Sequence, residues 1–451
     1  MNLKQYSKCK ESGLEYIGKI PEHWEILPLK RLSKRIVVGI AEATTQSYVD
    51  KGVPLLRSTN IKSGIIDTDD LLYIDEDFAK KNSSKYLYSN DLLTVRTGNA
   101  GQTAVVPNSL NKSQCFTMLI TTLEKNYNPS FYNYFLNSLS GISYFDVTAW
   151  GTAQKNISVP ILKECLVPIL PLAEQDIAVK YLDSQTLKID NAIDKDKQLI
   201  ELLEEKRIAL INQTVTRELD PEAVLQDSGI EWMGKIPSKW TLRRIRFNCQ
   251  VNPKHQKHVS DKNQTVSFLP MEKVSTNGEI DHNSNVAYWE VSSGYTYFEN
   301  KDIILAKITP CFENGKGAMV DHLLNGFGFG TTEFHVLRAN ENVEPKFLYY
   351  FTHSHLFRVV GEAFMEGAAG QKRISAGFVK DFFMPTPPTK AEQIQISTFL
   401  DSETAKTDKL IKKIEKRIRL LEEYKKAIIN NVVTGKTDVR DQNGLSSKVF
   451  S

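Results

Sequence analysis

A long internal repeat limits the folds open to this chain more than any other feature of its sequence. The segment Gly13–Trp24 returns as Gly229–Trp240, an offset of 216 residues (229 minus 13), with 7 of 12 positions identical. Near the end of each half, Ala173–Gln175 returns as Ala391–Gln393 at an offset of 218 (391 minus 173). The repeating units of solenoids are about 20–50 residues long. A period this long therefore predicts two whole domains of one kind, each followed by the same kind of tail.

The two tails have the pattern of long helices that pair with each other. Residues 173–216 contain no Gly or Pro, and apolar residues recur there at alternating spacings of four and three, interrupted by Asp196 and Arg207. This heptad spacing is typical of coiled coils, and two equivalent helices of one chain are expected to run antiparallel. The alternative is that each tail packs alone on its own domain. The predicted seam consists of Ile189, Ile193, Ile200, Leu203 and Leu210 in the first tail and of Ile411, Ile414, Ile418, Leu421 and Ile428 in the second.

The rest of each half is expected to be a globular domain of mixed α/β type. Its short apolar runs are bounded by turn residues, and two of them, Asp91–Arg96 and Asp302–Lys307, correspond at an offset of 211 (302 minus 91). We therefore predict two pseudo-symmetric α/β domains joined by two long antiparallel coiled-coil helices. Thr389 and Glu392 are expected to form a capping box at the start of the second helix. The predicted boundaries are 1–170 and 226–385 for the domains, 171–225 and 386–435 for the helical regions, and 436–451 for a flexible tail.

Charge and cysteine content narrow the class of protein. The 57 basic residues are nearly balanced by 54 acidic ones, so a basic surface can only come from how the charges are arranged. No apolar run approaches the roughly 18–20 residues of a membrane span, and the N-terminal segment lacks the apolar stretch of a signal peptide. The five cysteines are scattered, without Cys-x-x-Cys spacing. They favour a reducing, cytoplasmic location over a disulfide framework or a structural zinc site.

A search for catalytic motifs identifies none. There is no Gly-x-x-x-x-Gly-Lys-[Ser/Thr] loop, and Asn252–His255 is not the Asn-Pro-Pro-aromatic sequence that amino-methyltransferases need to grip an exocyclic amine. Two histidine pairs, at 255 and 258 and at 353 and 355, lack a further ligand at a convincing spacing, and we interpret them as loop histidines. Gly326–Gly330 is interpreted as a glycine-rich turn. The sequence thus predicts a non-catalytic chain with no cofactor or metal of its own.

A polar segment near the end of each domain is the strongest candidate for binding. Trp150–Ser158 aligns with Ala368–Ser375 at an offset of 217 (371 minus 154). Small residues there allow close approach of a backbone, while the cations and amides suit phosphates and base edges. The competing interpretation is a turn that only positions the domain before its tail helix. With three further cations, the candidate DNA contacts are Arg57, Arg96, Thr152, Gln154, Lys155, Asn156, Lys307, Gln371, Lys372 and Arg373.

Together these features resemble the specificity subunit of type I restriction–modification systems. Arg373 stands where the first half has Asn156, so a DNA contact made by Asn156 has no equivalent asparagine in the second half. The signals cover both halves almost end to end. They are Gly-Lys-Ile-Pro-x-x-Trp at 18–24 and 234–240, Gln154–Ser158 before the first tail, and Leu172–Gln175 with Leu182 and Asp183, echoed by Ala391–Gln393 with Leu400 and Asp401.

The resemblance implies a DNA-binding protein rather than an enzyme. Each domain would be a target recognition domain that reads one half of an asymmetric, bipartite site in double-stranded DNA. The helices would set the gap between the half-sites and dock two methyltransferase subunits, to which restriction subunits add. S-adenosylmethionine, ATP and Mg²⁺ are then expected on the partner subunits. The rivals are a stand-alone DNA-modifying enzyme and a coiled-coil scaffold without DNA readout. A scaffold would explain the helices but not the matching polar segments.

Overall fold

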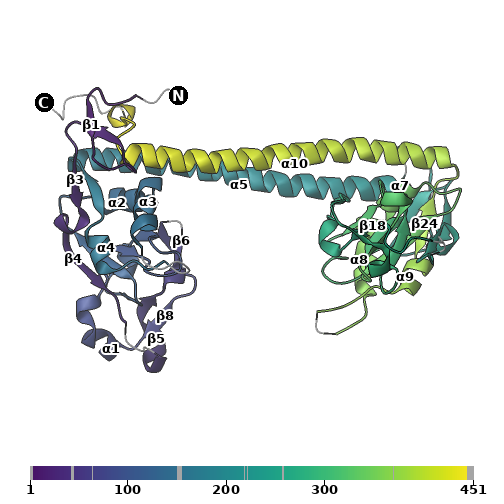
Figure 1. Cartoon of the computed structure of the whole chain (residues 1–451), viewed down its shortest axis with the longest axis horizontal. Helices are drawn as coiled ribbons and strands as arrows, with labels where there is room; N and C mark the ends of the chain where they lie inside the picture. Colours follow the sequence, from purple (N-terminus) through teal and green to yellow (C-terminus); the bar gives the residue numbers. More distant parts are fainter. Residues whose placement is uncertain are drawn as a thin grey trace. The chain divides into compact units, whose positions relative to one another are not determined.

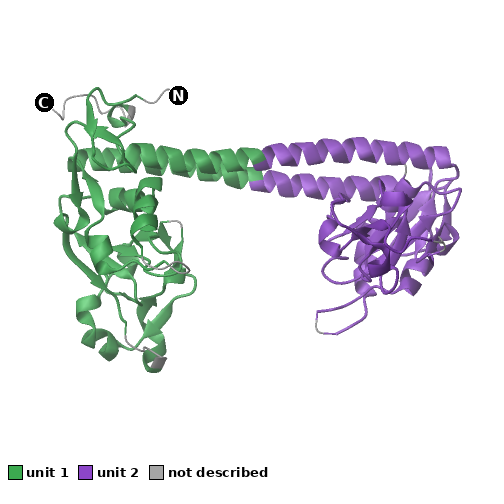
Figure 2. Cartoon of the chain, in the orientation of Figure 1, with its two compact units in different colours: residues 1–196, 416–451 green, residues 197–415 purple. Residues whose placement is uncertain are grey.

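The chain divides into two units, and each unit takes residues from both halves of the sequence (Figure 2). Unit 1 consists of residues 1–196 and 416–451, and unit 2 consists of residues 197–415. The two long helices, α5 (Leu172–Arg217) and α10 (Lys390–Val433), therefore each contribute to both units. The structure is a computed structural model (Figure 1). It describes residues 4–41, 45–62, 64–149, 155–217, 219–220, 222–255, 259–368 and 370–443.

Unit 1 is built around a four-stranded antiparallel sheet with the strand order β10-β9-β12-β4. Its strands are β4 (Ser33–Val38), β9 (Leu92–Thr94), β10 (Thr103–Val105) and β12 (Leu119–Leu123). A second sheet has the order β11-β5-β8, from β5 (Tyr48–Leu56), β8 (Leu72–Ile74) and β11 (Gln114–Cys115). The paired short strands are β1 (Cys9–Glu11) with β2 (Lys19–Pro21), β3 (Glu25–Pro28) with β13 (Leu166–Ile169), and β6 (Ile61–Lys62) with β7 (Ile65–Ile66). The helices are α1 (Glu76–Lys81), α2 (Pro129–Leu136), α3 (Leu139–Thr148) and α4 (Val159–Lys163).

Unit 2 has a counterpart of the first sheet, with the order β17-β24-β21-β22. Its strands are β17 (Cys249–Val251), β21 (Ile303–Ala306), β22 (Gly317–Met319) and β24 (Phe334–Ala339). The second sheet, β19-β18-β23-β20, contains β18 (Thr265–Leu269), β19 (Asn285–Ala287), β20 (Thr296–Glu299) and β23 (Phe327–Gly330). The paired short strands are β14 (Leu225–Asp227) with β15 (Lys235–Pro237) and β16 (Thr241–Arg244) with β25 (Phe383–Thr386). The helices are α6 (Tyr288–Val291), α7 (Pro345–Thr352), α8 (His355–Ala363) and α9 (Ala376–Asp381).

The corresponding strands β9 and β21 each follow a buried aspartate. Asp91 and Asp302 are both 1% exposed, and an isolated buried carboxylate is strongly unfavourable. Arg35 of β4 donates to Asp91 at 3.0 Å, whereas Arg338 of β24 donates to Asp302 through both Nε (2.8 Å) and Nη2 (2.7 Å). The position equivalent to Arg338 holds Thr122, which also donates to Asp91, at 2.6 Å. The same frame is thus stabilised by a cation from a different strand in each unit.

The two long helices run antiparallel, and ion pairs record their register. In unit 1, Lys425 donates to Asp190 at 2.6 and 2.7 Å. In unit 2, Arg207 lies 3.4 Å from Asp408. An offset of 218 relates Asp190 to Asp408 (408 minus 190) and Arg207 to Lys425, so one pair occurs twice with the helices exchanged. In each unit a segment of α10 lies alongside a segment of α5 (Figure 1). The helices therefore pair with each other instead of packing alone.

The polar residues that interrupt the heptads are accommodated by charge. Arg207 faces Asp408, as above, and Asp196, which is 3% exposed, accepts a hydrogen bond from Arg417 Nε at 2.6 Å. Of the expected seam residues, Ile189, Ile193, Ile414 and Ile428 are buried. The remaining six are half-buried, namely Ile200, Leu203, Leu210, Ile411, Ile418 and Leu421. Within the described ranges, no helix combines the length and apolar character needed to cross a membrane.

The residues repeated in the sequence join each domain to its helix. In unit 1 the indole N–H of Trp24 donates to Glu174 at 3.1 Å, and in unit 2 that of Trp240 donates to Glu392 at 2.8 Å. Both indoles are almost fully buried. Because its carboxylate binds Trp240, Glu392 is not the second half of a capping box. Thr389 provides the other half alone, since its hydroxyl accepts from the backbone N–H of Glu392 at 3.2 Å.

The adjacent glutamines and a pair of asparagines repeat this docking. Gln175 accepts from the backbone N–H of Asn128 and Gln393 from that of Glu344, both at 2.8 Å, next to the starts of α2 and α7. At the starts of α3 and α8, the backbone N–H groups of Ser140 and Leu356 donate to the side chains of Asn430 and Asn212, both at 3.0 Å. Free N–H groups at a helix start need acceptors, so these amides fix the domain helices against α5 and α10.

The segment just after α10 differs from expectation. Residues 436–451 are predicted to be a flexible tail, of which 444–451 lie outside the described residues. Val439, however, is only 2% exposed, and the backbone N–H of Asp438 donates to the carbonyl of Lys4 at 2.8 Å. Arg440 pairs with Asp438 at 2.7 Å and lies over the ring of Tyr6, 4.8 Å from its centroid. Lys4 and Tyr6 come from the other end of the sequence, so local composition could not reveal these contacts.

Candidate DNA interface

The polar segments occupy equivalent places beside the buried strands β9 and β21. In unit 1 the carbonyl of Arg96, just after β9, accepts from the backbone N–H of Ile157 at 2.9 Å. In unit 2 the carbonyl of Lys307, just after β21, accepts from the N–H of Ile374, also at 2.9 Å. Each segment then enters a short helix, α4 or α9, through a serine cap. The ends of both segments therefore have a positioning role, whatever else their side chains do.

In unit 1 the cations of the segment are partly neutralised. Lys155 forms an ion pair with Asp146, and both side chains are half-exposed. Arg96 donates from Nε to the amide oxygen of Asn156 at 3.2 Å and forms no ion pair with any described residue. A cation that carries no carboxylate partner remains available to a phosphate. Two of the candidates, Thr152 and Gln154, lie outside the described residues.

In unit 2 the segment contains a stronger internal pair. Arg373 donates to Glu333 from Nη2 at 2.9 Å and from Nε at 3.0 Å, and this contact lowers the pKa of Glu333. His335, which is 5% exposed, contacts the carbonyl of Ile374 through Nε2 at 2.9 Å. Burial is the main cause that lowers the pKa of His335. The cluster thus carries one neutral imidazole and one compensated arginine.

The remaining candidates differ in their exposure and in whether they form ion pairs. Gln371 and Lys372 are exposed, and among the described residues the Lys372 ammonium has no ion pair. The side chain of Lys307 is half-buried and likewise forms no ion pair there. Arg57 lies in the turn after β5, where its Nη2 donates to Asp70 at 2.6 Å. None of the described hydrogen bonds or ion pairs joins Arg57 to the polar segment of unit 1.

The sequence did not identify Glu333 and His335 as members of this cluster. Both belong to the run Thr331–His335 at the start of β24, which sequence alone marks only as the end of a glycine-rich stretch. Glu333 meets Arg373 across 40 positions of the chain, and His335 meets Ile374 across 39. A carboxylate and a histidine near the end of the strand that pairs with β21 are the only local signal.

A family model matches both halves of the chain. It is the type I restriction modification DNA specificity domain, and it matches residues 23–205 and 237–420. The chain belongs to this family. The two matches each cover a domain together with most of its tail helix, so the repeat seen in the sequence is a repeat of this family domain. The resemblance inferred from the repeated motifs is confirmed.

Relatives in the family are specificity subunits. The EcoAI specificity subunit of Escherichia coli is 35% identical over 204 residues, which are 45% of this chain and 34% of that subunit. The chain therefore spans about a third of the length of this relative. The EcoKI specificity subunit of Escherichia coli strain K12 is 21% identical over 432 residues, covering 93% of this chain and 90% of that one.

Solved structures have the same fold. A chain from a study of complex assembly and conformational transition in a type I R-M system has a TM-score of 0.70 at 14% identity, covering 92% of this chain and 98% of its own. The HsdS subunit of Thermoanaerobacter tengcongensis has a TM-score of 0.55 at 15% identity, with the same coverage. The predicted fold class is confirmed: two α/β domains joined by two long antiparallel helices.

Proposed function

We propose that this chain is the DNA-reading subunit of a type I restriction–modification complex, and that its two domains read the two halves of an asymmetric, bipartite site. The observation that carries the proposal is the comparison of the polar segments. Both lie beside equivalent strands and precede equivalent short helices, yet one offers Lys155 and Asn156 where the other offers Lys372 and Arg373. An invariant frame with variable polar contents suits a pair of readers with different targets.

The candidate side chains divide by the contacts that they can make. Lys372 and the less compensated Arg96 and Lys307 suit phosphates, which position a protein on DNA. Gln371, Asn156 and the Arg373–Glu333 pair present amide, guanidinium and carboxylate groups that can pair with base edges. Arg57, Thr152, Gln154 and Lys155 complete the proposed contact set.

The two helices act as the spacer between half-sites in this proposal. Their seam and ion pairs fix one register, so a change in helix length changes the separation of the readers. The complex would also contain two methyltransferase subunits docked on this chain, restriction subunits, and S-adenosylmethionine, ATP and Mg²⁺ bound by those partners. The chain itself would be non-catalytic and cytoplasmic.

Exchange of one domain tests whether the two readers are independent. Residues 226–385 are replaced by the equivalent region of a relative, and the chain is expressed with its methyltransferase partner. Modified-base sequencing of the cellular DNA is expected to show one half-site changed and the other retained. A change in both half-sites would contradict independent reading. If the unaltered chain and its partner produce no sequence-specific methylation, the result would favour a scaffold without DNA readout.

Insertion of residues in the 189–211 stretch tests the spacer. Four added residues lengthen a helix by roughly 6 Å, close to two base pairs of B-DNA at about 3.4 Å each. The expected motif has the same half-sites and a gap longer by one or two base pairs. An unaltered gap, in a variant that still assembles and methylates, would show that these helices do not set the spacing.

A further inference from the structure

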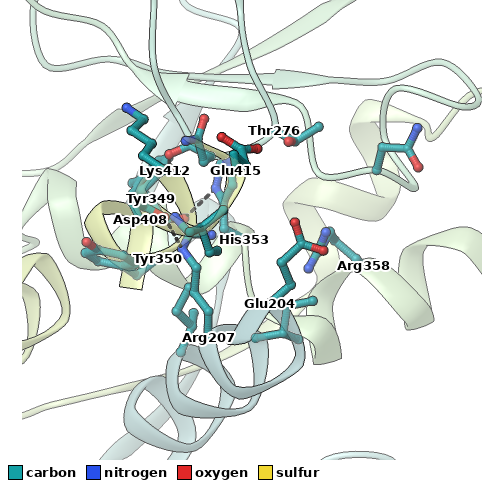
Figure 3. A pocket seen from close by; sticks show the side chains of 15 residues that line it. Glu204, Arg207, Thr276, Tyr349, Tyr350, His353, Arg358, Asp408, Lys412 and Glu415 are labelled. Atoms are coloured by element: carbon teal, nitrogen blue, oxygen red, sulfur yellow. Dashed lines mark hydrogen bonds and ion pairs between the residues drawn. The ribbon is translucent and has the colours of Figure 1, made fainter. Parts of the chain in front are cut away.

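Unit 2 contains a cavity of about 510 Å³ (Figure 3). No residue of the polar segment 368–375 lines it. Its walls come from α5, α10, α7 and α8, together with loops at Asn277 and Asn314. Apolar and aromatic side chains line it, and several charged groups converge on it (Figure 3). This volume falls within the roughly 300–1,000 Å³ that is typical of sites for small ligands.

Two arginines line this cavity, and one of them lacks a partner. The Nε atoms of Arg207, from α5, and Arg358, from α8, are both buried and make no hydrogen bond. The Nε of Arg207 still forms an ion pair with Asp408 at 3.4 Å, whereas Arg358 forms no ion pair with any described residue. Burial lowers the pKa of Arg358, and the nearby charge of Arg207 lowers it further. The two arginines line the same cavity, where their like charges disfavour each other.

This arrangement is unfavourable as it stands. A buried donor without an acceptor costs about 1–3 kcal/mol, and more when it is charged, so each such group in a native protein requires an explanation. Gly315 leaves room for one of these groups, because a Cβ at this position would collide with the Arg358 guanidinium. The chain thus accommodates a second, half-buried cation without providing it with a counterion.

Asp408 lines the cavity and pairs with Arg207, but the other acidic residues around it pair with neither arginine. Glu204 and Glu415 line it but are exposed, and neither forms a hydrogen bond or ion pair with the two arginines. Lys412 is already paired with Glu279 at 3.1 Å. His353 is held by the carbonyls of Tyr349 (2.9 Å) and Gly317 (3.1 Å).

Unit 1 shows that the fold does not require Arg358. The position equivalent to Arg358 holds Ile142 (358 minus 142 is 216), and the position equivalent to Arg207 holds Lys425. Lys425 is fully engaged by Asp190 at 2.6 and 2.7 Å. The same junction of helices is therefore built in unit 1 with one satisfied cation. Unit 2 adds a second cation, Arg358, at a junction that unit 1 builds without one.

We propose that Arg207 and Arg358 bind a phosphate group in this cavity. Two guanidinium groups that reach the cavity from different helices need acceptors in different directions. A tetrahedral phosphate offers these, whereas the two oxygens of a carboxylate lie in one plane and match a single guanidinium fork. The amide side chains of Asn277 and Asn314 supply neutral donors at the wall. The phosphate is either a phosphodiester of DNA or the phosphate of a free small molecule such as a nucleotide. Only the first source rests on the function proposed above.

Inorganic phosphate binding to the full chain tests the site without DNA. Isothermal titration in a phosphate-free buffer compares the wild type with Arg358→Ile, which copies unit 1, with Arg358→Lys, and with the control Arg419→Gln, an exposed arginine of α10. Arg358→Ile is expected to weaken phosphate binding about tenfold or more, Arg358→Lys to weaken it partly, and Arg419→Gln to leave it unchanged. In the absence of phosphate, Arg358→Ile is expected to melt at the same temperature as the wild type or higher, because it removes an uncompensated buried charge.

A second experiment, on duplex DNA binding, identifies the source of the phosphate. The affinity for duplex DNA is measured against salt concentration for the same variants in the complete complex. If the phosphate belongs to DNA, Arg358→Ile lowers the salt slope by about one unit, and inorganic phosphate competes with the duplex. If the phosphate belongs to a small molecule, Arg358→Ile loses binding of inorganic phosphate while the salt slope of duplex binding is unchanged.

Equal phosphate binding by the wild type and Arg358→Ile would overturn the proposal, as would a strongly destabilised Arg358→Ile chain that still binds phosphate. Lost assembly with the methyltransferase subunit, without any phosphate effect, would assign the arginines to a protein carboxylate instead. A chain that binds phosphate at this site but no DNA would contradict only the proposed function.

Discussion

The two units share their contacts with the long helices but differ in the polar residues that they expose. Trp24 with Glu174 and Trp240 with Glu392 form the same buried hydrogen bond. By contrast, the candidate DNA contacts pair Lys155 with Asp146 in one unit and Arg373 with Glu333 in the other. The difference indicates that the most visible repeats in the sequence are architectural. Residues that vary on a constant frame are the better candidates for function.

The junction with the helices extends this comparison. His353 and Arg358 of unit 2 replace Asn137 and Ile142 of unit 1 (353 minus 137 and 358 minus 142 are both 216). Asn137 binds the backbone of Thr103 in both directions, at 3.0 and 2.8 Å, so unit 1 uses a neutral side chain where unit 2 has a titratable one. The two units therefore differ in charge, and in sensitivity to pH, at a place where their folds agree.

Loss of the buried tryptophan is expected to have the largest effect. Trp240→Ala removes a core side chain and its bond to Glu392, at a cost of about 3–5 kcal/mol, and Trp24→Ala does the same in unit 1. Hydrogen exchange followed by mass spectrometry is expected to show lost protection in the altered unit only. Trp289→Ala, which changes a side chain that is 60% exposed, is the control. Equal loss of protection in both units would show that they unfold as one.

Acid is expected to destabilise unit 2 through His353, where unit 1 has no titrating counterpart. Burial lowers the pKa of His353 to about 4, while the unfolded chain titrates near 6.5, so between these values the unfolded state binds the extra proton. The contribution to stability is complete above about pH 6.5 and is lost as the pH falls to 4, by about 3 kcal/mol.

Denaturation of His353→Asn across this pH range measures that contribution. The acid decline of unit 2 is expected to be shallower than in the wild type by this amount. His355→Asn alters an exposed neighbour and should leave the decline unchanged. Parallel declines for the wild type and His353→Asn would show that this imidazole is already protonated in the folded chain.

The smallest effect is expected for the lysines of the polar segments. If they contact phosphates, Lys372→Ala lowers the salt slope of DNA binding by about one unit. Lys155→Ala lowers it by less, because Asp146 competes for this ammonium. Fluorescence anisotropy over a range of salt concentrations checks both, with the exposed Lys413→Ala as control. An unchanged slope for Lys155→Ala combined with Lys372→Ala would assign these segments to structure alone.

Local patterns in the sequence predicted the regular elements well. The heptads predicted two long antiparallel helices, and the runs at Asp91 and Asp302 predicted β9 and β21. Gly326–Gly330 was wrongly interpreted as a turn, since β23 (Phe327–Gly330) is a buried strand. A Cβ at Gly328 or Gly330 would meet the ring of Phe298 from the neighbouring strand, so these glycines make room for an aromatic side chain.

The polar chemistry was predictable in residue type but not in partner. Nothing near Arg373 in the sequence indicates Glu333, and nothing near Glu392 indicates that Trp240 competes for its carboxylate. The two arginines of the cavity are 151 positions apart (358 minus 207). That Arg358 lacks a partner in a cavity that Arg207 also lines is visible only once both helices are in place.

The pair between Asp196 and Arg417 has a consequence for assembly between copies of the chain. Because the two halves are similar, α5 of one molecule could pair with α5 of another in the same register. Leu199 would then stand where Arg417 stands (417 minus 218), and Asp196 would be buried without its cation, at a cost of about 3–5 kcal/mol. Asp196→Leu should therefore raise the fraction of molecules that pair through α5 with a second copy. Size-exclusion chromatography coupled to light scattering measures this fraction from the mass of each peak. The single charge of Asp196 in the heptad seam thus favours pairing of α5 with α10 of the same chain over pairing with α5 of another chain.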